Sequence, residues 1–316
     1  MPLYQRLKKR RDAASTLVRV QIFLKFSITP DMPPFSKDTL VAVDSDGCAF
    51  DAMNGKHFNV FIPEAVAVFG LEKYGDLYPE AAKTVNLFSD LRGCNRFPAL
   101  YCSLMLAQKR LGQPLDIPDV EPYREFLASG SGLSRDALTR WNETQPAPVL
   151  EKVIEWNDRV NARFKDDTAA HRAFEGVADT LRAAAAFADV MVCSAASRAT
   201  LVDEWAAGGL DGFVTLIAGQ ENGTKSEQLQ SAVRAGGFDP AKVLMIGDAP
   251  GDHAAAQAAG AWFYPIVPGD EEHAWQVCRH AVLPAFRRGA YTREMEAVYL
   301  EQFHRNLPPC EVQPPS

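Results

Sequence analysis

An apolar segment that ends in two carboxylates constrains the fold of this chain more than any other feature. Residues 40–43 (Leu-Val-Ala-Val) have strand character, and Asp44, Ser45, Asp46 and Gly47 follow directly. A buried strand gains nothing from aspartates at its end, whereas ligands bind at the carboxyl ends of strands in an open α/β sheet. Two carboxylates there can bind a divalent cation, and one can act as a nucleophile. The segment therefore predicts a sheet strand with a reaction site at its end.

Further strand-like segments alternate with helical ones in the second half of the chain. We expect strands at 190–193, 213–217, 243–246 and 262–266, with helices at 225–235 and 251–259 between the later ones. Repeated βα units of this length indicate a parallel sheet with helices on both faces. The core is therefore expected to comprise residues 37–56 and 170–290.

The segment between the first two predicted strands, residues 57–169, has a helical pattern. Apolar residues recur at helical spacing after Pro63, and we expect further helices at 79–88, 98–111 and 150–164. A helical module inserted after the acidic motif would lie over the strand ends and act as a lid. The predicted fold is thus an α/β core with an all-helical cap.

The two ends of the chain look different from the core. Residues 1–40 hold eight Lys and Arg against three Asp, and we interpret residues 1–36 as an N-terminal extension. Residues 291–316 are expected to form a helix at 292–303 and a disordered Pro-rich tail at 308–315.

Charge and cysteine usage exclude several classes of partner. The net charge of -7 argues against nucleic acid, and the lack of a long apolar stretch argues against a membrane. The six cysteines form no CxxC pair, and Cys48 and Cys193 adjoin apolar strands as buried thiols would. This usage favours a reducing cytoplasm.

Four short motifs follow predicted strands or their turns. They are Asp44–Gly47, Ser194–Ser197, Thr224-Lys225 and Gly247–Asp252. Each alone is typical of a turn or a helix cap, but the ends of parallel strands meet at one edge of a sheet, so together they indicate a site.

The chemistry of the four motifs is coherent for a phosphate ester. Lys225 and the Ser194 hydroxyl can bind a phosphate, and Mg²⁺ between Asp44 and Asp248 can offset carboxylate repulsion. Asp44 can then attack phosphorus, while Asp46 protonates the leaving oxygen and later deprotonates water.

The set of motifs, in this order, resembles the haloacid dehalogenase-like hydrolase superfamily, and the helical insertion resembles the C1 cap of its subfamily I. The resemblance implies a Rossmann-like parallel sheet in the order 3-2-1-4-5 and Mg²⁺-dependent phosphoryl transfer. It implies nucleophile and acid/base roles for Asp44 and Asp46, and phosphate binding by Ser194, Ala195 and Lys225. The implied metal ligands are Asp44, the main-chain carbonyl of Asp46, Asp248 and, in support, Asp252. Because dehalogenases of this kind have no second acid, Asp46 favours a phosphatase or phosphomutase.

One loop of the cap, residues 91–97 (Leu-Arg-Gly-Cys-Asn-Arg-Phe), resembles the LxGxxR loop of β-phosphoglucomutase-like caps. The resemblance implies substrate recognition by Arg92, Asn95 and Arg96; the alternative for the two arginines is a salt bridge within the cap. His57, at the expected hinge, contacts substrate or is structural. The cap is otherwise longer than in that family, so we do not transfer the mutase activity or its sugar substrate.

These features predict a cytoplasmic, Mg²⁺-dependent phosphatase of a small phosphorylated metabolite that works through an aspartyl-phosphate. A phosphomutase or a phosphonatase is the alternative, the latter needing a Schiff-base lysine such as Lys73, Lys83 or Lys109. A non-catalytic binding or regulatory protein is a further alternative. The oligomeric state is not predicted.

Overall fold

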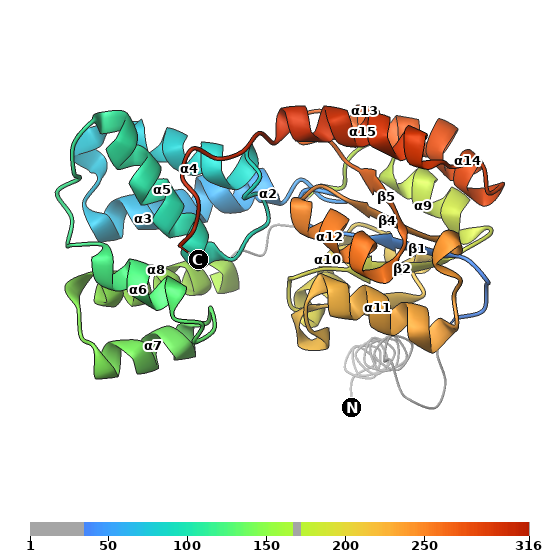
Figure 1. The fold of residues 1–316 in the computed structure, drawn as a ribbon. Coiled ribbons are helices and arrows are strands. Elements are labelled where there is room, and N and C mark those ends of the chain that lie inside the picture. The colour runs from blue at the N-terminus through green and yellow to red at the C-terminus, as the bar shows by residue number, and fades with distance from the viewer. Residues whose placement is uncertain (1–34, 167–171, 316) are drawn as a thin grey trace, which may run out of the picture.

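One parallel sheet forms the centre of the larger lobe (Figure 1). The structure, a computed structural model, describes residues 35–166 and 172–315 of the 316-residue chain. Its strands run in the order β3-β2-β1-β4-β5. Their bounds are β1 Leu40–Val43, β2 Asp189–Cys193, β3 Leu216–Ala218, β4 Val243–Gly247 and β5 Trp262–Pro265. This confirms the predicted sheet and its strand order.

The register of the sheet brings the four motifs to one edge. Val43 of β1 lies opposite Val192 of β2 and Ile246 of β4. Since the three strands are parallel and their residues are in step, the segments after them begin side by side. Asp44 also donates its backbone N–H to the Ile246 carbonyl at 3.0 Å.

Strand β3 begins later than its sequence pattern predicts. The pattern indicates a strand at 213–217, but Asp211–Phe213 form a 3₁₀ turn and β3 is Leu216–Ala218. Asp and Gly at 211 and 212 favour a turn over a strand. Pairing with the sheet begins at Thr215, whose N–H donates to the Val190 carbonyl.

Helices cover both faces of the sheet, so each face has its own apolar cluster. One cluster joins one face of the sheet to α9, α10, α13 and α14, and the other joins the opposite face to α11 and α12. Helix α15 packs along β5. The bounds are α9 Val177–Ala185, α10 Arg198–Ala207, α11 Lys225–Gly236, α12 Pro250–Ala259, α13 Glu271–Val277, α14 Leu283–Arg287 and α15 Arg293–Asn306.

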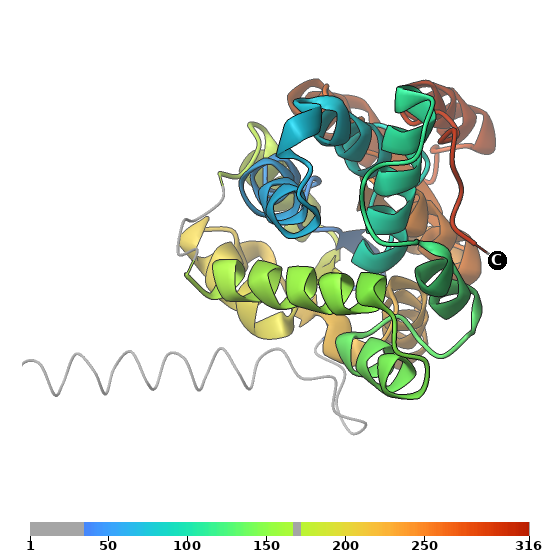
Figure 2. The ribbon, with the colours of Figure 1, turned by 90° about the vertical axis from the view of Figure 1, so that its left-hand side faces the viewer.

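The second lobe is helical and is inserted between β1 and β2. Figure 2 views it from its outer side, with the long helix α8 running across the front. The bounds are α2 Met53–Lys56, a π-helical turn at His57–Phe61, α3 Ile62–Phe69, α4 Leu77–Leu87, α5 Arg96–Leu111, α6 Glu121–Ala128, α7 Arg135–Thr144 and α8 Pro148–Asp166. This confirms the predicted helical cap. Helix α2 belongs to the segment 37–56 that the sequence predicts as core, but it lies on the cap side of the connection (Figure 1).

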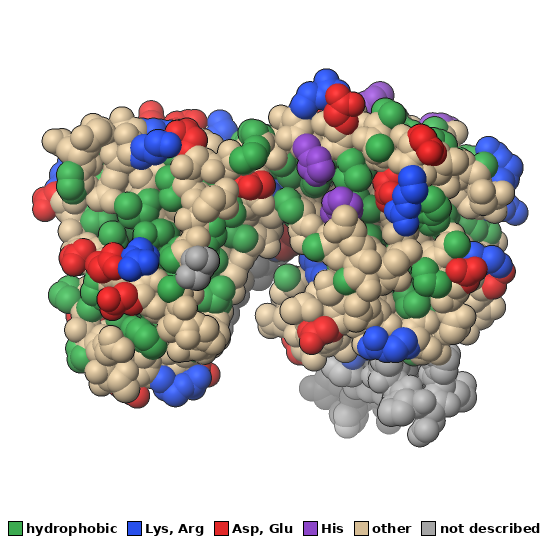
Figure 3. All heavy atoms as spheres, viewed as in Figure 1, with side chains coloured by type: hydrophobic (Ala, Val, Ile, Leu, Met, Phe, Trp, Pro, Cys, Tyr) green, Lys and Arg blue, Asp and Glu red, His purple; other side chains and the backbone are tan. Residues whose placement is uncertain are grey.

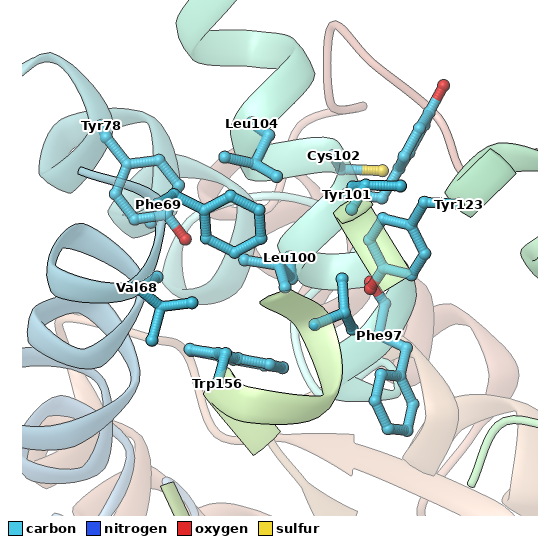
Figure 4. Close-up of a cluster of buried hydrophobic side chains, with 14 of the residues drawn as sticks. Val68, Phe69, Tyr78, Phe97, Leu100, Tyr101, Cys102, Leu104, Tyr123 and Trp156 are labelled. Atoms are coloured by element: carbon cyan, nitrogen blue, oxygen red, sulfur yellow. The ribbon is translucent and has the colours of Figure 1, made fainter. Parts of the chain in front are cut away.

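The cap has its own hydrophobic core. Buried side chains of α3, α4, α5, α6 and α8 meet in it, among them Phe69, Tyr78, Leu104, Tyr123 and Trp156 (Figure 4). The space-filling view shows the two lobes as separate masses that join along part of their facing sides (Figure 3). The boundary predicted between residues 169 and 170 lies outside the described residues, as does the N-terminal extension except for residues 35 and 36.

The C-terminal tail is ordered against the cap, and the prediction that it is disordered is wrong. After α15 the chain crosses from the larger lobe to the cap (Figure 1). Asp90 donates its N–H to the Pro308 carbonyl at 3.0 Å, and its Oδ1 accepts from the Cys310 N–H at 2.8 Å. Cys310 is buried in the cap core, and Glu311 pairs with Lys109 at 3.0 Å. The prolines exclude a helix but leave an extended segment free to dock.

Two further expectations concern membrane-spanning helices and the state of the cysteines. Within the described part of the chain, no helix has the length and apolar character needed to cross a membrane. All six cysteines are free thiols, and Cys48 and Cys193 are buried as predicted.

Candidate active site

Asp44 lies at the carboxyl end of β1 with only 4% of its surface exposed. The Lys225 ammonium is 2.9 Å from Asp44 Oδ2 and 2.6 Å from Asp252 Oδ1. Lys225 is the first residue of α11, which begins at a capping box formed by Thr224 and Glu227. That cap fixes the helix start and thereby directs the lysine side chain toward the end of β1.

Three buried carboxylates converge beside this lysine. Oxygen atoms of Asp44, Asp248 and Asp252 all lie within 4.8 Å of one another. Asp252, in the first turn of α12, accepts the backbone N–H groups of Asp248 and Ala249 through Oδ2. Asp248 Oδ1 is buried and has no hydrogen-bond partner among the described residues. Buried carboxylate oxygens with a free acceptor are the ligands that Mg²⁺ prefers, so these residues fit the implied metal.

The electrostatics of the cluster follow from its burial. Burial raises the pKa of Asp44 well above its usual value, with Lys225 opposing this and the other two aspartates adding to it. Burial alone would lower the pKa of Lys225, but the carboxylates of Asp252, Asp44 and Asp248 raise it well above its usual value. The lysine is therefore a permanent cation, and the aspartates need further positive charge to be ionised together.

The second motif acid, Asp46, has a lysine partner from the cap. Lys56, the last residue of α2, places its ammonium 2.5 Å from Asp46 Oδ2, while Oδ1 has no hydrogen-bond partner among the described residues. Ser45 donates its hydroxyl to Glu204 of α10 at 3.2 Å. Burial first, and then the Asp46 carboxylate, raises the pKa of Glu204 to about 7. Neither Lys56 nor Glu204 stands at a strand end, so no motif in the sequence indicated them.

The predicted phosphate-binding loop follows β2. Ser194 is 2% exposed, and Ala195 beside it is exposed. The buried Gln228 amide lies within 2.9 Å of three carbonyls, those of Ser194, Gly219 and Gly223, and donates to them. Gln228 therefore joins the loop after β2 to the turn before α11. Gln228 lies one turn after Lys225 on the inner side of α11, and this spacing could have indicated it from the sequence.

The cap loop reaches the acidic cluster through Arg92. This residue is 4% exposed, and its Nε is 2.6 Å from Asp248 Oδ2. Its Nη1 donates to the Leu87 carbonyl at 3.1 Å. Gly47 has φ of 81°, and a Cβ there would lie 2.5 Å from both Arg92 Nη2 and Asp248 Oδ2. A Cβ on Gly93 would lie 2.8 Å from the Cβ of Ala249, so two glycines permit this close approach.

The other predicted cap residues point elsewhere. Arg96 donates to Asn157 at 3.3 Å and to Asn161 at 2.8 Å, and it lies over the Phe61 ring. Asn95 accepts the Phe97 N–H as the N-cap of α5. Of the three, the structure brings only Arg92 to the acidic cluster; recognition of substrate by any of them stays a prediction.

His57 is buried at the start of the π-helical turn that follows α2, against the Phe61 ring. Burial first, and then the charges of Arg92 and Lys56, lowers the pKa of His57 to about 3. The imidazole is therefore neutral at physiological pH. Its Nδ1 has no hydrogen-bond partner among the described residues.

The doubly wound core, the inserted helical cap and the acidic cluster at the strand ends define a cap-bearing α/β fold with a candidate active site. Residues 118–265, which run from before α6 to the end of β5, match the family model for haloacid dehalogenase-like hydrolases. Over these residues the chain is similar to that superfamily. The Asp44 motif lies outside the matched residues, and no curated protein sequence matches the chain.

Similar solved structures include several hydrolases of this kind. A haloacid dehalogenase-like hydrolase from Xanthomonas campestris is 12% identical over 82% of this chain and 98% of its own, with a TM-score of 0.45. One from Streptococcus pneumoniae is 17% identical over 75% and 90%, with a TM-score of 0.40. A predicted phosphoglycolate phosphatase from Haemophilus somnus is 13% identical over 77% and 88%, with a TM-score of 0.42. Similarity at this level says nothing about the substrate.

Proposed function

We propose that this hydrolase is a Mg²⁺-dependent phosphatase that acts on a small phosphorylated metabolite through an aspartyl-phosphate on Asp44. The observation that carries the proposal is the buried Asp44 carboxylate, held at 2.9 Å by Lys225 and flanked by Asp248 and Asp252. A nucleophilic carboxylate that must meet a dianionic phosphate needs such compensation.

The residues of the site divide the reaction between them. Asp44 attacks phosphorus, while Lys225 and the Ser194 hydroxyl bind the phosphoryl oxygens. Mg²⁺ held by Asp44, the main-chain carbonyl of Asp46 and Asp248, with Asp252 in support, would supply the remaining positive charge. The buried position of Asp44 under the cap limits the access of bulk water.

Asp46 acts as the general acid and then as the general base. It protonates the leaving oxygen, and its carboxylate then deprotonates the water that attacks the aspartyl-phosphate. Its contact with Lys56 orients the carboxylate, because the ammonium holds one of its two oxygens. Lys56 follows Asp46 by ten residues in the segment that leads from β1 into the cap.

Phosphate release from a panel of sugar phosphates, nucleotides and para-nitrophenyl phosphate, with Mg²⁺ and with EDTA, tests the proposal. We expect turnover that EDTA abolishes and that Asp44→Asn abolishes. Asp51→Asn is the matched control, since Asp51 is an exposed acid of the same segment that accepts only from Asn54 among the described residues. Activity of Asp44→Asn equal to the parent would contradict the nucleophile assignment.

The alternative activities gain no support from the cap lysines. Lys73, Lys83 and Lys109 have 48%, 38% and 55% of their side-chain surfaces exposed, and each pairs with a surface acid. A Schiff-base lysine needs a desolvated place at the reacting centre. Phosphomutase activity and a cytoplasmic location stay predictions.

A further inference from the structure

Arg92 is a cation of the cap that lies beside the predicted metal ligand Asp248, and it has no role in the proposed reaction. Arg92 belongs to the cap loop, and Asp248 to the loop after β4 of the core. Their side chains are only 3% and 2% exposed, and 2.6 Å separates Arg92 Nε from Asp248 Oδ2. An ion pair this deeply buried is coupled strongly to any other charge that reaches it.

The net charge of the acidic cluster depends on whether a metal ion and a phosphate are bound. If all three carboxylates are ionised, they and the two cations that contact them, Lys225 and Arg92, carry one net negative charge. A divalent cation alone would turn this into one net positive charge, with the guanidinium beside it. A divalent cation together with a phosphate dianion would return the sum to one net negative charge.

We propose that Arg92 is a counter-ion that competes with Mg²⁺ for Asp248, and that it thereby couples metal binding to the cap loop and to phosphate. This inference rests on the Mg²⁺ site of the proposed function. Arg92 lowers the affinity for Mg²⁺ alone, and a phosphate dianion restores it. By linkage, Mg²⁺ alone weakens the hold of the cap loop on the core.

The local geometry makes the competition direct. The Arg92 guanidinium also donates to the Leu87 carbonyl of its own lobe, which fixes its direction. Gly47 and Gly93 admit it without a side chain in the way. The guanidinium therefore has little freedom to move aside unless the loop itself moves.

Calorimetric titration of the metal-stripped protein with Mg²⁺ tests the inference, with the fold of each variant checked by circular dichroism. We expect Arg92→Gln to bind Mg²⁺ about tenfold more tightly than the parent. Arg92→Lys, which keeps the charge, should bind like the parent. Arg96→Gln, a guanidinium of the same loop that contacts asparagines instead, should also bind like the parent. A merely structural loss would weaken binding, not tighten it.

Inorganic phosphate supplies the second half of the test. Phosphate should tighten Mg²⁺ binding by the parent severalfold and by Arg92→Gln much less. Equal or weaker Mg²⁺ binding by a folded Arg92→Gln would overturn the role of Arg92 while leaving the metal site intact. A lack of Mg²⁺ binding by both the parent and Arg92→Gln, with and without phosphate, would overturn the metal assignment and this inference together.

A measurement on the unaltered chain covers the case in which Arg92→Gln fails to fold. Hydrogen exchange of the backbone at residues 88–95 should become severalfold faster when Mg²⁺ is added alone and slow again when phosphate follows. Exchange that is unchanged or slowed by Mg²⁺ alone would overturn the coupling.

Discussion

Lys225 is the residue whose single charge supports most of the site, since it contacts both Asp44 and Asp252. Lys225→Met leaves buried carboxylates without their cation. We expect phosphatase activity to fall by about 100-fold or more, and the free energy of unfolding in EDTA to fall by about 3 kcal/mol. Steady-state kinetics and denaturant unfolding measure the two effects. Lys242→Met, which removes a half-exposed surface pair with Asp38, should change neither, and equal losses in both variants would contradict the assignment.

Glu204 makes the stability of the folded protein decrease as the pH rises. Its pKa is raised from 4.5 to about 7, so the folded state holds the proton more tightly than the unfolded state. Stability is therefore lost as the pH rises through that window. The glutamine of Glu204→Gln cannot ionise. The free energy of unfolding of this variant, relative to that of the parent, should therefore rise by about 1 kcal/mol from about pH 5 to about pH 8, allowing for partial exposure. Thermal unfolding across this range measures the difference; Glu301→Gln, an exposed acid, is the control, and a constant difference for Glu204→Gln would contradict the prediction.

The residues that sequence could predict are those whose chemistry conflicts with their surroundings. Asp44 and Asp248 are acids at the ends of apolar strands, which is conspicuous in any pattern. Lys56, Gln228 and Glu204 lie within helices, where a polar residue at one position is unremarkable. Only the packing of those helices on the strand ends brings them to the site, so their roles depend on tertiary contacts that no local pattern encodes.

At the scale of elements, the tail after α15 forms hydrogen bonds with the residue that precedes the cap loop. Asp90 precedes the loop that carries Arg92, and it bonds to Pro308 and Cys310 of the tail. A chain that ends after Leu307 loses these bonds and exposes the part of the cap core that Cys310 covers. We expect faster hydrogen exchange at residues 88–95 and a loss of about 1–3 kcal/mol in unfolding free energy.

A chain that ends after Gln313 is the matched control, because it keeps every contact that the tail makes with Asp90. Exchange at residues 88–95 that is the same in both truncated chains would show that the tail does not hold the loop.

The docking of this tail could not be predicted from the sequence, because a proline-rich composition argues only against helix and strand. Strands β1, β2, β4 and β5 were predictable because each is a short apolar run that ends at a turn, whereas β3 pairs over only three residues.

At the scale of the whole molecule, ionic contacts connect two separately packed lobes. The cap core and the clusters on the two sheet faces consist of different residues, the tail residue Cys310 belonging to the cap core. Across the described residues, Lys56–Asp46 and Arg92–Asp248 are ion pairs that run from cap to core at the reacting centre. Because ionic pairs respond to added charge and apolar cores do not, substrate and metal can alter the joint between the lobes without disturbing either lobe.

Separate cores predict that damage to one lobe stays in that lobe. Leu104 of α5 is fully buried in the cap core (Figure 4). Leu104→Ala should destabilise the cap by about 2–4 kcal/mol. Hydrogen exchange should therefore rise across α4 and α5 while β1 and β4 keep their protection, because the sheet packs on its own clusters. Leu133→Ala, at a site 39% exposed in the same lobe, should leave exchange nearly unchanged. An equal rise in both lobes would mean that cap and core unfold as one cooperative unit, with the ion pairs and the tail strong enough to tie them together.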